Sequence, residues 1–131
     1  MAVKRTTIDK IAEVIGDVLE DYVTEITEDV NEAALTAGKQ GRSELRQTSP
    51  KRTGQYARGW DTLTTQDPIN KALTVTVYNA KMPQLTHLLE NGHAKRGGGR
   101  VNGIPHIRPA EQNAVNEFVR LVKEAIERGK T

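Results

Sequence analysis

The chain lacks cysteine entirely, and it has few aromatic residues and no long apolar run. Without cysteine there are no disulfide bonds and no thiolate metal sites, which fits a reducing compartment. No stretch approaches the roughly 20 apolar residues that a membrane span needs, and residues 1–10 lack the apolar core of a signal peptide. We therefore expect a soluble protein that is made in a cytoplasm and has no membrane partner.

The charges are segregated along the chain, although the net charge is only +2. Residues 9–32 carry nine acids and one lysine, a local balance of −8, whereas residues 39–108 carry twelve lysines and arginines and four acids, a balance of +8. This separation favours head-to-tail contact between copies. The alternative is a solvated acidic helix face beside unrelated basic loops. The acidic residues that we single out as interface candidates are Glu13, Asp17, Glu20, Asp21 and Glu28.

A long helix is predicted near the start of the chain, over residues 7–46. Apolar residues recur there at steps of three and four, beginning with Ile8, Ile11, Ile15, Val18 and Tyr22. Gly38 and Gly41 weaken the helix and Pro50 stops it, so a bend near Gly38 is an option. At 1.5 Å per residue the helix is about 60 Å long, which exceeds the width of a domain of this size. We therefore expect part of it to lean on another chain or to break.

The middle and the end of the chain predict a small sheet and a second helix. Residues 56–65 and 72–79 are expected to form two antiparallel strands joined over 66–71, because apolar and polar side chains alternate in the second segment. Residues 109–128 carry a wide apolar stripe, which predicts a helix that covers the sheet. Residues 103–107 are an option for a further strand.

The expected fold is α+β within a single domain that spans residues 1–131. It consists of the long helix, a sheet and loop region over residues 47–108 and the C-terminal helix packed on the sheet. Within the middle region, apolar residues before Gly92 predict one or two further helical turns, which this glycine ends.

The loop that precedes the last helix is basic and glycine-rich. Lys95, Arg96 and Arg100 surround three consecutive glycines, so residues 94–103 have little apolar surface to bury and great backbone freedom. We expect this loop to be mobile until a partner orders it, and to act as a docking element.

Four motifs follow one another in an order that is typical of a known family. They are Ser49-Pro50 with Thr53-Gly54 and Trp60, then Tyr78-Asn79, then Leu88-Leu89-Glu90-Asn91-Gly92-His93, then Ile104-Pro105-His106-Ile107-Arg108-Pro109-Ala110. In this order they resemble the neck or minor tail component family of long-tailed bacteriophages. The resemblance spans about residues 49–126, and the acidic helix matches it only in kind. It implies a non-enzymatic head–tail joining or tail-completion protein, without a cofactor, that assembles as a ring around the DNA channel.

The first motif has a structural and a functional interpretation. Thr53 and Gly54 form a turn through their local chemistry alone, and in the functional interpretation this turn displays Lys51 and Arg52 to a neighbouring ring. Trp60, the only tryptophan, is expected to be a core anchor rather than an interface hot spot.

The later motifs supply further structural candidates. Glu90 is expected to accept loop N–H groups at the end of its helix or to pair with Arg108. His106 lies between two prolines and is expected to be a packed histidine. The other structural candidates are Leu88, Leu89, Gly92, Pro105 and Pro109.

Two other functional classes are alternatives. His87, Glu90, His93 and His106 could be drawn around a zinc ion, but helical ligand pairs lie three or four residues apart and Gly92 breaks the helix before His93. A nucleic-acid-binding protein is the second alternative, because the basic residues suit it, but few aromatic side chains are available for stacking. Nothing in the sequence requires a metal, a cofactor or catalysis.

We therefore expect a structural virion protein of the phage neck, made in the host cytoplasm. Its expected partners are further copies of itself in a hexameric ring, adjacent neck, head-closure, tail-terminator or tail-tube proteins, and DNA contacted without sequence specificity. The acidic helix is expected to close the ring. The basic loop is expected to dock on the adjacent ring or to line the channel.

Overall fold

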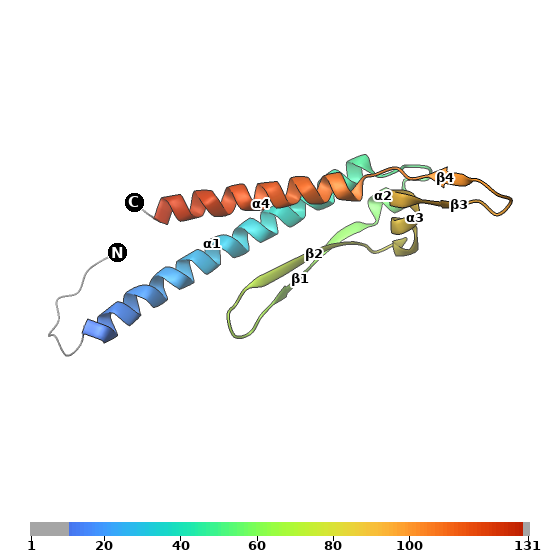
Figure 1. Ribbon diagram of the computed structural model, residues 1–131. Helices are drawn as coiled ribbons and strands as arrows, with labels where there is room; N and C mark the ends of the chain where they lie inside the picture. The colour runs from blue at the N-terminus through green and yellow to red at the C-terminus, as the bar shows by residue number, and fades with distance from the viewer. Residues whose placement is uncertain (1–10, 130–131) are drawn as a thin grey trace.

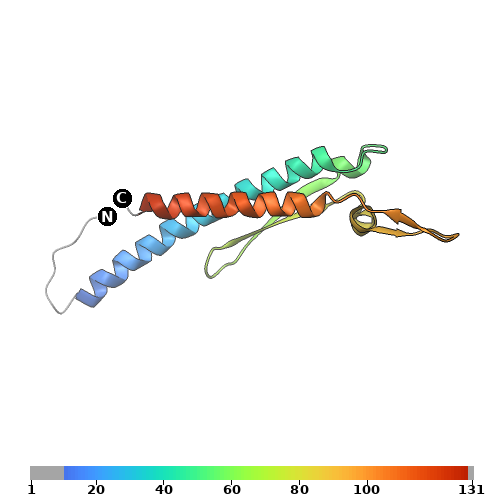
Figure 2. The ribbon, with the colours of Figure 1, turned by 45° about the horizontal axis from the view of Figure 1, so that its top comes forward.

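In the computed structural model, which describes residues 11–129, the molecule is long and narrow (Figure 1). Two helices, α1 (Ile11–Thr48) and α4 (Ile107–Gly129), lie side by side along it. The hairpin of β1 (Trp60–Gln66) and β2 (Leu73–Asn79) packs on another side of α1. Figures 1 and 2 agree that a second hairpin projects from the end opposite to the start of α1. The α+β class is therefore confirmed.

The predicted long helix is confirmed, since α1 runs for 38 residues from Ile11 to Thr48 without a break at Gly38 or Gly41. The predicted start at residue 7 falls outside the described residues. The helix ends two residues later than predicted, and the N–H of Ser49 still donates an α-helical hydrogen bond of 3.0 Å to the carbonyl four residues back. At 1.5 Å per residue the described helix is about 57 Å long.

Two glycines of α1, Gly38 and Gly41, lie where other elements approach the helix closely. A side-chain carbon added to Gly38 would overlap Val75 of β2, so the sheet can rest on the backbone of α1 only because no side chain is there. A carbon added to Gly41 would lie at ordinary contact distances, 3.6 Å from Ala114 and 3.8 Å from Val77. The helix stays continuous because packing outweighs a propensity loss of about 1 kcal/mol for each glycine.

We expect Gly38→Ala and Gly41→Ala to have opposite effects on stability. Alanine at 41 fits the available space and should raise the free energy of unfolding by about 0.5–1 kcal/mol. Alanine at 38 forces the sheet away from α1 and should lower it by about 1–2 kcal/mol. Urea unfolding followed by circular dichroism measures both changes. Equal stabilisation by the two variants would contradict the close approach of Val75.

The first hairpin is confirmed, because β1 and β2 pair antiparallel over all seven residues of each strand. The first strand nevertheless begins later than predicted, since residues 56–58 belong to a short helix, α2 (Gln55–Arg58). The side-chain amide of Asn79 donates to the carbonyl of Tyr56 at 2.8 Å and so holds this helical turn against the end of β2. The turn directs Tyr56 into the core, where it is buried.

Polar side chains of α1 hold the first hairpin in place. The amide nitrogen of Asn31 donates to the carbonyl of Lys71 at 2.9 Å, and its oxygen accepts the N–H of Leu73 at 3.0 Å. The guanidinium of Arg46 donates to the carbonyl of Trp60 through two nitrogens, at 3.0 and 2.7 Å. The hairpin is therefore fixed to α1 both near its turn and at its base.

Two short helical segments, η2 (Pro83–Leu85) and α3 (Thr86–Asn91), follow the first hairpin and confirm the predicted helical turns. Gly92 ends them with a φ of 78°, a left-handed value that favours glycine. A side-chain carbon at Gly92 would also overlap the carbonyl of Val101, so the next hairpin depends on this glycine.

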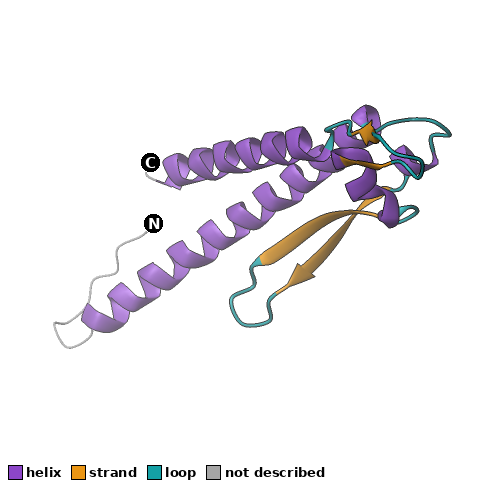
Figure 3. Ribbon diagram, turned by 45° about the vertical axis from the view of Figure 1, so that its right-hand side comes forward, coloured by secondary structure: helices purple, strands orange, loops and turns teal. Residues whose placement is uncertain are grey.

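The basic segment over residues 94–103 is part of a second hairpin. Its two ends belong to β3 (Gly92–Ala94) and β4 (Arg100–Asn102), which pair antiparallel. The hairpin is labelled in Figure 1, and Figure 3 shows its strands end-on as short orange pieces. The N–H of Lys95 donates to the carbonyl of Gly99 at 3.0 Å and closes the tip. Two further strands thus lie before residues 103–107 and form a sheet of their own. Residues 103–107 instead lead back to α3, where the N–H of Ile104 donates to the carbonyl of Leu89 at 2.7 Å.

The last helix, α4, contains the whole of the predicted segment 109–128. It packs mainly on α1, and it approaches the sheet near Gly41, which both Ala114 and Val77 face. The predicted helix therefore covers α1 more than it covers the sheet. No described helix is both long and apolar enough to cross a membrane. The core cluster at this end of the molecule consists of Leu45, Tyr56, Trp60 and Ala110.

Candidate assembly site

Glu90, near the end of α3, caps the N-terminus of α4. Its Oε1 accepts the N–H groups of His106 at 2.7 Å and Ile107 at 2.8 Å, and its Oε2 accepts the N–H of Arg108 at 3.0 Å. The first turn of a helix has N–H groups without helical partners and the positive end of the helix dipole, so a carboxylate is stabilising there. Arg108 contacts Glu90 through its backbone N–H. Of the two roles expected for Glu90, the structure thus shows the acceptance of backbone N–H groups.

His106 continues this network into the core, where it is only 2% exposed. Its Nδ1 lies 2.7 Å from the carbonyl oxygen of Ile104 and 3.1 Å from Oε1 of Glu90, and its Nε2 lies 2.7 Å from the hydroxyl of Tyr56. One arrangement satisfies all these contacts: the Tyr56 hydroxyl donates to Nε2, and a proton on Nδ1 is shared between the two oxygens. The network joins α2, α3 and α4.

Burial opposes the negative charge of Glu90, yet the pKa of this carboxyl lies below its usual value. Desolvation alone would raise the pKa, but the three backbone N–H donors and His106 outweigh it. Burial, and secondly the nearby charge of Glu90, raise the pKa of Tyr56 to about 12. At neutral pH the cluster therefore combines a carboxylate with a neutral phenol.

Trp60 packs beside this network and links it to the end of α1. Its indole N–H donates to the hydroxyl of Ser49 at 2.8 Å. Its ring meets those of Tyr56 and His106 edge to face, with centroids 5.6 and 6.4 Å apart. Three of the sequence motifs thus meet at one place, which we call the junction. It is formed by Ser49, Tyr56, Trp60, Glu90 and His106.

An apolar pocket of about 490 Å³ opens at this junction. Arg52 lines it together with Thr53, Gly54 and Gln55, and Lys51 is exposed next to it in sequence. The predicted basic turn therefore forms one side of a pocket. The apolar lining consists of Pro50, Tyr56, Met82, Leu85 and Leu89.

The three basic residues expected in the docking loop do not act as one group. Lys95 and Arg96 are exposed at the tip between β3 and β4, which projects from the same end of the molecule as the pocket (Figure 1). Arg100 instead donates to the carbonyl of Asn91 at 2.9 Å, which ties it to the base of the hairpin. Of the three cations expected in this loop, Lys95 and Arg96 thus lie at the tip itself, together with the glycines between the strands.

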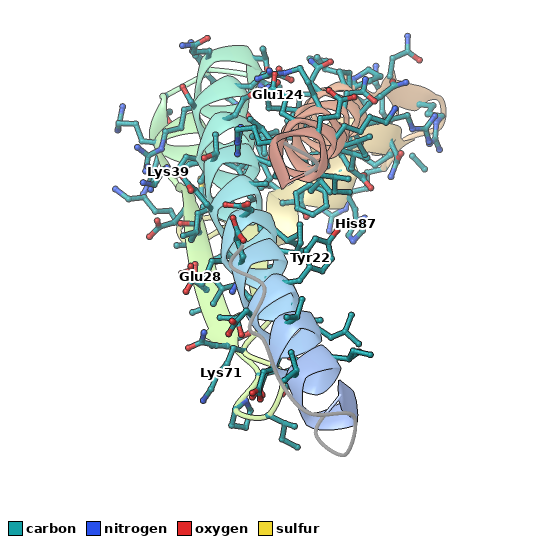
Figure 4. All side chains as sticks on the ribbon, turned by 90° about the vertical axis from the view of Figure 1, so that its left-hand side faces the viewer. Tyr22, Glu28, Lys39, Lys71, His87 and Glu124 are labelled. Carbon is teal, nitrogen blue, oxygen red and sulfur yellow. The ribbon has the colours of Figure 1, made fainter. Side chains whose placement is uncertain are left out.

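The acidic candidates lie at the opposite end, on the first half of α1. Four of them are exposed, and the side chain of Glu13 lies outside the described residues. Figure 4, which looks along the helices, shows Tyr22 and Glu28 on opposite sides of α1. Tyr22 of the apolar stripe and Glu28 of the acidic set therefore point to different sides of the helix. The four exposed acids are Asp17, Glu20, Asp21 and Glu28.

Within residues 11–129, no three His, Cys, Asp or Glu side chains lie where they could hold a metal ion together. His106 is buried beside Glu90, whereas His87 and His93 are exposed on α3 and β3. The zinc arrangement that could be drawn from the sequence is thus not assembled by the fold.

Sequence reasoning missed the role of Asn79 in the junction. Its Oδ1 accepts the N–H groups of Lys81 at 3.2 Å and Met82 at 2.8 Å, while its amide holds Tyr56. Asparagine at the end of a strand favours turns of this kind, so this local part of its role could have been found. The contact with Tyr56 spans 23 residues and has no local signal.

Residues 6–92 match the family model described as "Bacteriophage HK97-gp10, putative tail-component". The match covers more than half of the chain, and the chain therefore belongs to this family of phage tail components. It includes the acidic helix, which resembled the family only in kind, and it ends at Gly92, before the motif that begins at Ile104. The resemblance to phage neck and tail components is confirmed. No curated protein and no solved structure gave a significant match.

Proposed function

We propose that the chain is a non-enzymatic neck protein that joins head to tail by forming a ring. The family supports a structural role in the virion. The observation that supports the ring is the placement of charge: the acidic residues lie on one end of a long molecule, and the basic turn and hairpin tip lie on the other. Opposite charges at opposite ends favour heterologous contacts, which close into rings when the rotation allows it.

Each part of the molecule has a place in this proposal. The junction around Glu90 and Trp60 forms the rigid body, and α1 carries the acidic surface to a neighbouring subunit in a hexamer. The tip with Lys95 and Arg96 contacts the adjacent head-closure, tail-terminator or tail-tube ring, or the DNA in the channel. Exposed cations of this kind bind the phosphates of the DNA backbone, whatever the base sequence.

The purified protein is expected to self-associate at low salt and to dissociate as salt rises. Exposed charges attract over a screening length of about 10 Å at 0.1 M salt, which falls to about 3 Å at 1 M. Sedimentation velocity and native mass spectrometry across this range measure the size of the assembly. Electron microscopy of particles of the parent phage then tests whether the same assembly lies in the neck.

Two results would contradict the ring. The first is a protein that stays monomeric at every salt and protein concentration, with no ring density in the particle. The second is a monomer that binds DNA with a steep salt dependence and is missing from the virion, which would favour the nucleic-acid-binding alternative.

A further inference from the structure

The pocket at the junction combines an apolar floor with a positive rim. Its lining includes five apolar residues and Arg52, and none of the lining residues is acidic. The guanidinium of Arg58 lies against Gly54, which also lines the pocket, so a second cation borders it. Lys51 and both of these arginines are exposed. A ligand that fits this pocket must therefore present apolar side chains flanked by negative charge.

The first half of α1 has this chemistry. Ile15, Leu19 and Val23 recur every four residues and form one ridge, and they are 54%, 58% and 60% exposed. At 3.6 residues per turn, Glu20 lies about 60° beyond Val23 on one side of the ridge, and Glu25 lies about 80° beyond Ile15 on the other side, past Tyr22 and Val18. Residues 14–32 contain seven acids and no lysine or arginine. The ridge is thus an exposed apolar surface on a helical segment in which every charged residue is acidic.

We propose that the pocket of one copy receives the ridge of a second copy. The pocket is lined by residues around α2 and α3, and the ridge lies near the start of α1. These elements lie at opposite ends of the long molecule (Figure 1), so one chain cannot join its own two surfaces. The contact is heterologous, since each subunit uses its ridge on one neighbour and its pocket on the other. The inference rests on the proposed self-assembly and specifies which surfaces make it.

Cysteine cross-linking tests the pairing directly, because the chain has no cysteine of its own. We place one cysteine on the ridge, Leu19→Cys, and one on the pocket rim, Gln55→Cys, in separate full-length proteins. A mixture treated with a short bis-maleimide is expected to give a mixed dimer, and each protein alone is not. Ile69→Cys, at a 91% exposed turn residue of the first hairpin, replaces the rim variant as the matched control and should not cross-link to Leu19→Cys.

Charge reversal tests the same contact by affinity. Arg52→Glu with Arg58→Glu, and separately Glu20→Arg with Glu25→Arg, should each weaken self-association roughly tenfold or more, because like charges then face each other. Mixing the two reversed proteins should restore association between them. All four side chains are exposed, so circular dichroism should show unchanged folding.

The outcomes separate this inference from the proposed function. Self-linking of Leu19→Cys would show ridge against ridge and overturn the inference. Salt-sensitive rings that neither cross-link through these residues nor respond to charge reversal would overturn it while leaving the ring intact. A protein that is monomeric in isolation, but whose rim variant cross-links to another tail protein in the particle, would overturn the second copy as the occupant.

Discussion

Replacing Trp60 with alanine is expected to lower the free energy of unfolding by about 3–5 kcal/mol. The side chain is buried at the junction, where its ring contacts Tyr56 and His106 and its N–H binds the hydroxyl of Ser49. Removing it empties the centre of a small core and leaves that hydroxyl without its donor. Because single domains are stable by only about 5–15 kcal/mol, much of the total stability is lost.

Trp60→Phe is the matched control that separates the loss of packing from the loss of the hydrogen bond to Ser49. It keeps an aromatic ring but cannot donate to Ser49, so the expected loss is smaller, about 1–3 kcal/mol. Urea unfolding should be followed by circular dichroism, since both variants remove the only tryptophan. A loss below about 1 kcal/mol for Trp60→Ala would show that the junction is not the stability centre of the chain.

Glu90→Gln is expected to be the second most damaging change, with a loss on the order of 3 kcal/mol at neutral pH. Glutamine keeps the length of the side chain but removes the charge that three backbone N–H groups and His106 contact. It also brings an NH₂ group against donors, so at least one of them loses its acceptor. Glu111→Gln, at an exposed position of α4, is the control.

The same carboxyl gives the stability of the protein a pH dependence with a defined sign. The pKa of Glu90 is lower in the folded chain than in the unfolded one, so its contribution is complete above the unfolded value of about 4.3 and is lost as pH falls through the folded pKa. The wild-type protein should therefore lose stability on acidification more steeply than Glu90→Gln. Unfolding midpoints in urea between pH 7 and acid measure this, and parallel pH curves for the two proteins would refute the cap.

The helices could be predicted from the sequence because their signals are local and repeated. Apolar residues at steps of three and four indicate both α1 and α4, and the alternation of apolar and polar residues from Leu73 to Val77 indicates β2. The predicted ends of strands and loops were wrong where a residue distant in sequence determines them. Residues 56–58 became a helical turn because Asn79 binds the carbonyl of Tyr56, and the basic loop became a hairpin because Gly92 lets β4 approach.

The candidate site was predicted in its residues but not in its arrangement. Glu90, Trp60 and His106 stood out in the motifs, yet their contacts span 11 to 50 residues of sequence and have no periodic signature. The pocket behind the basic turn was not foreseen at all. Its lining comes from residues 50–56 and 82–89, which only the folded junction brings together.

The side chain of Asn31 has a consequence for the edge of the sheet. An unpaired strand edge is a template on which another chain can add a strand, and β2 pairs with β1 alone among the described strands. By binding the carbonyl of Lys71 and the N–H of Leu73, Asn31 occupies two backbone groups with which such a strand would begin. The amide thus leaves these two backbone groups at the start of β2 unavailable for pairing with a foreign strand.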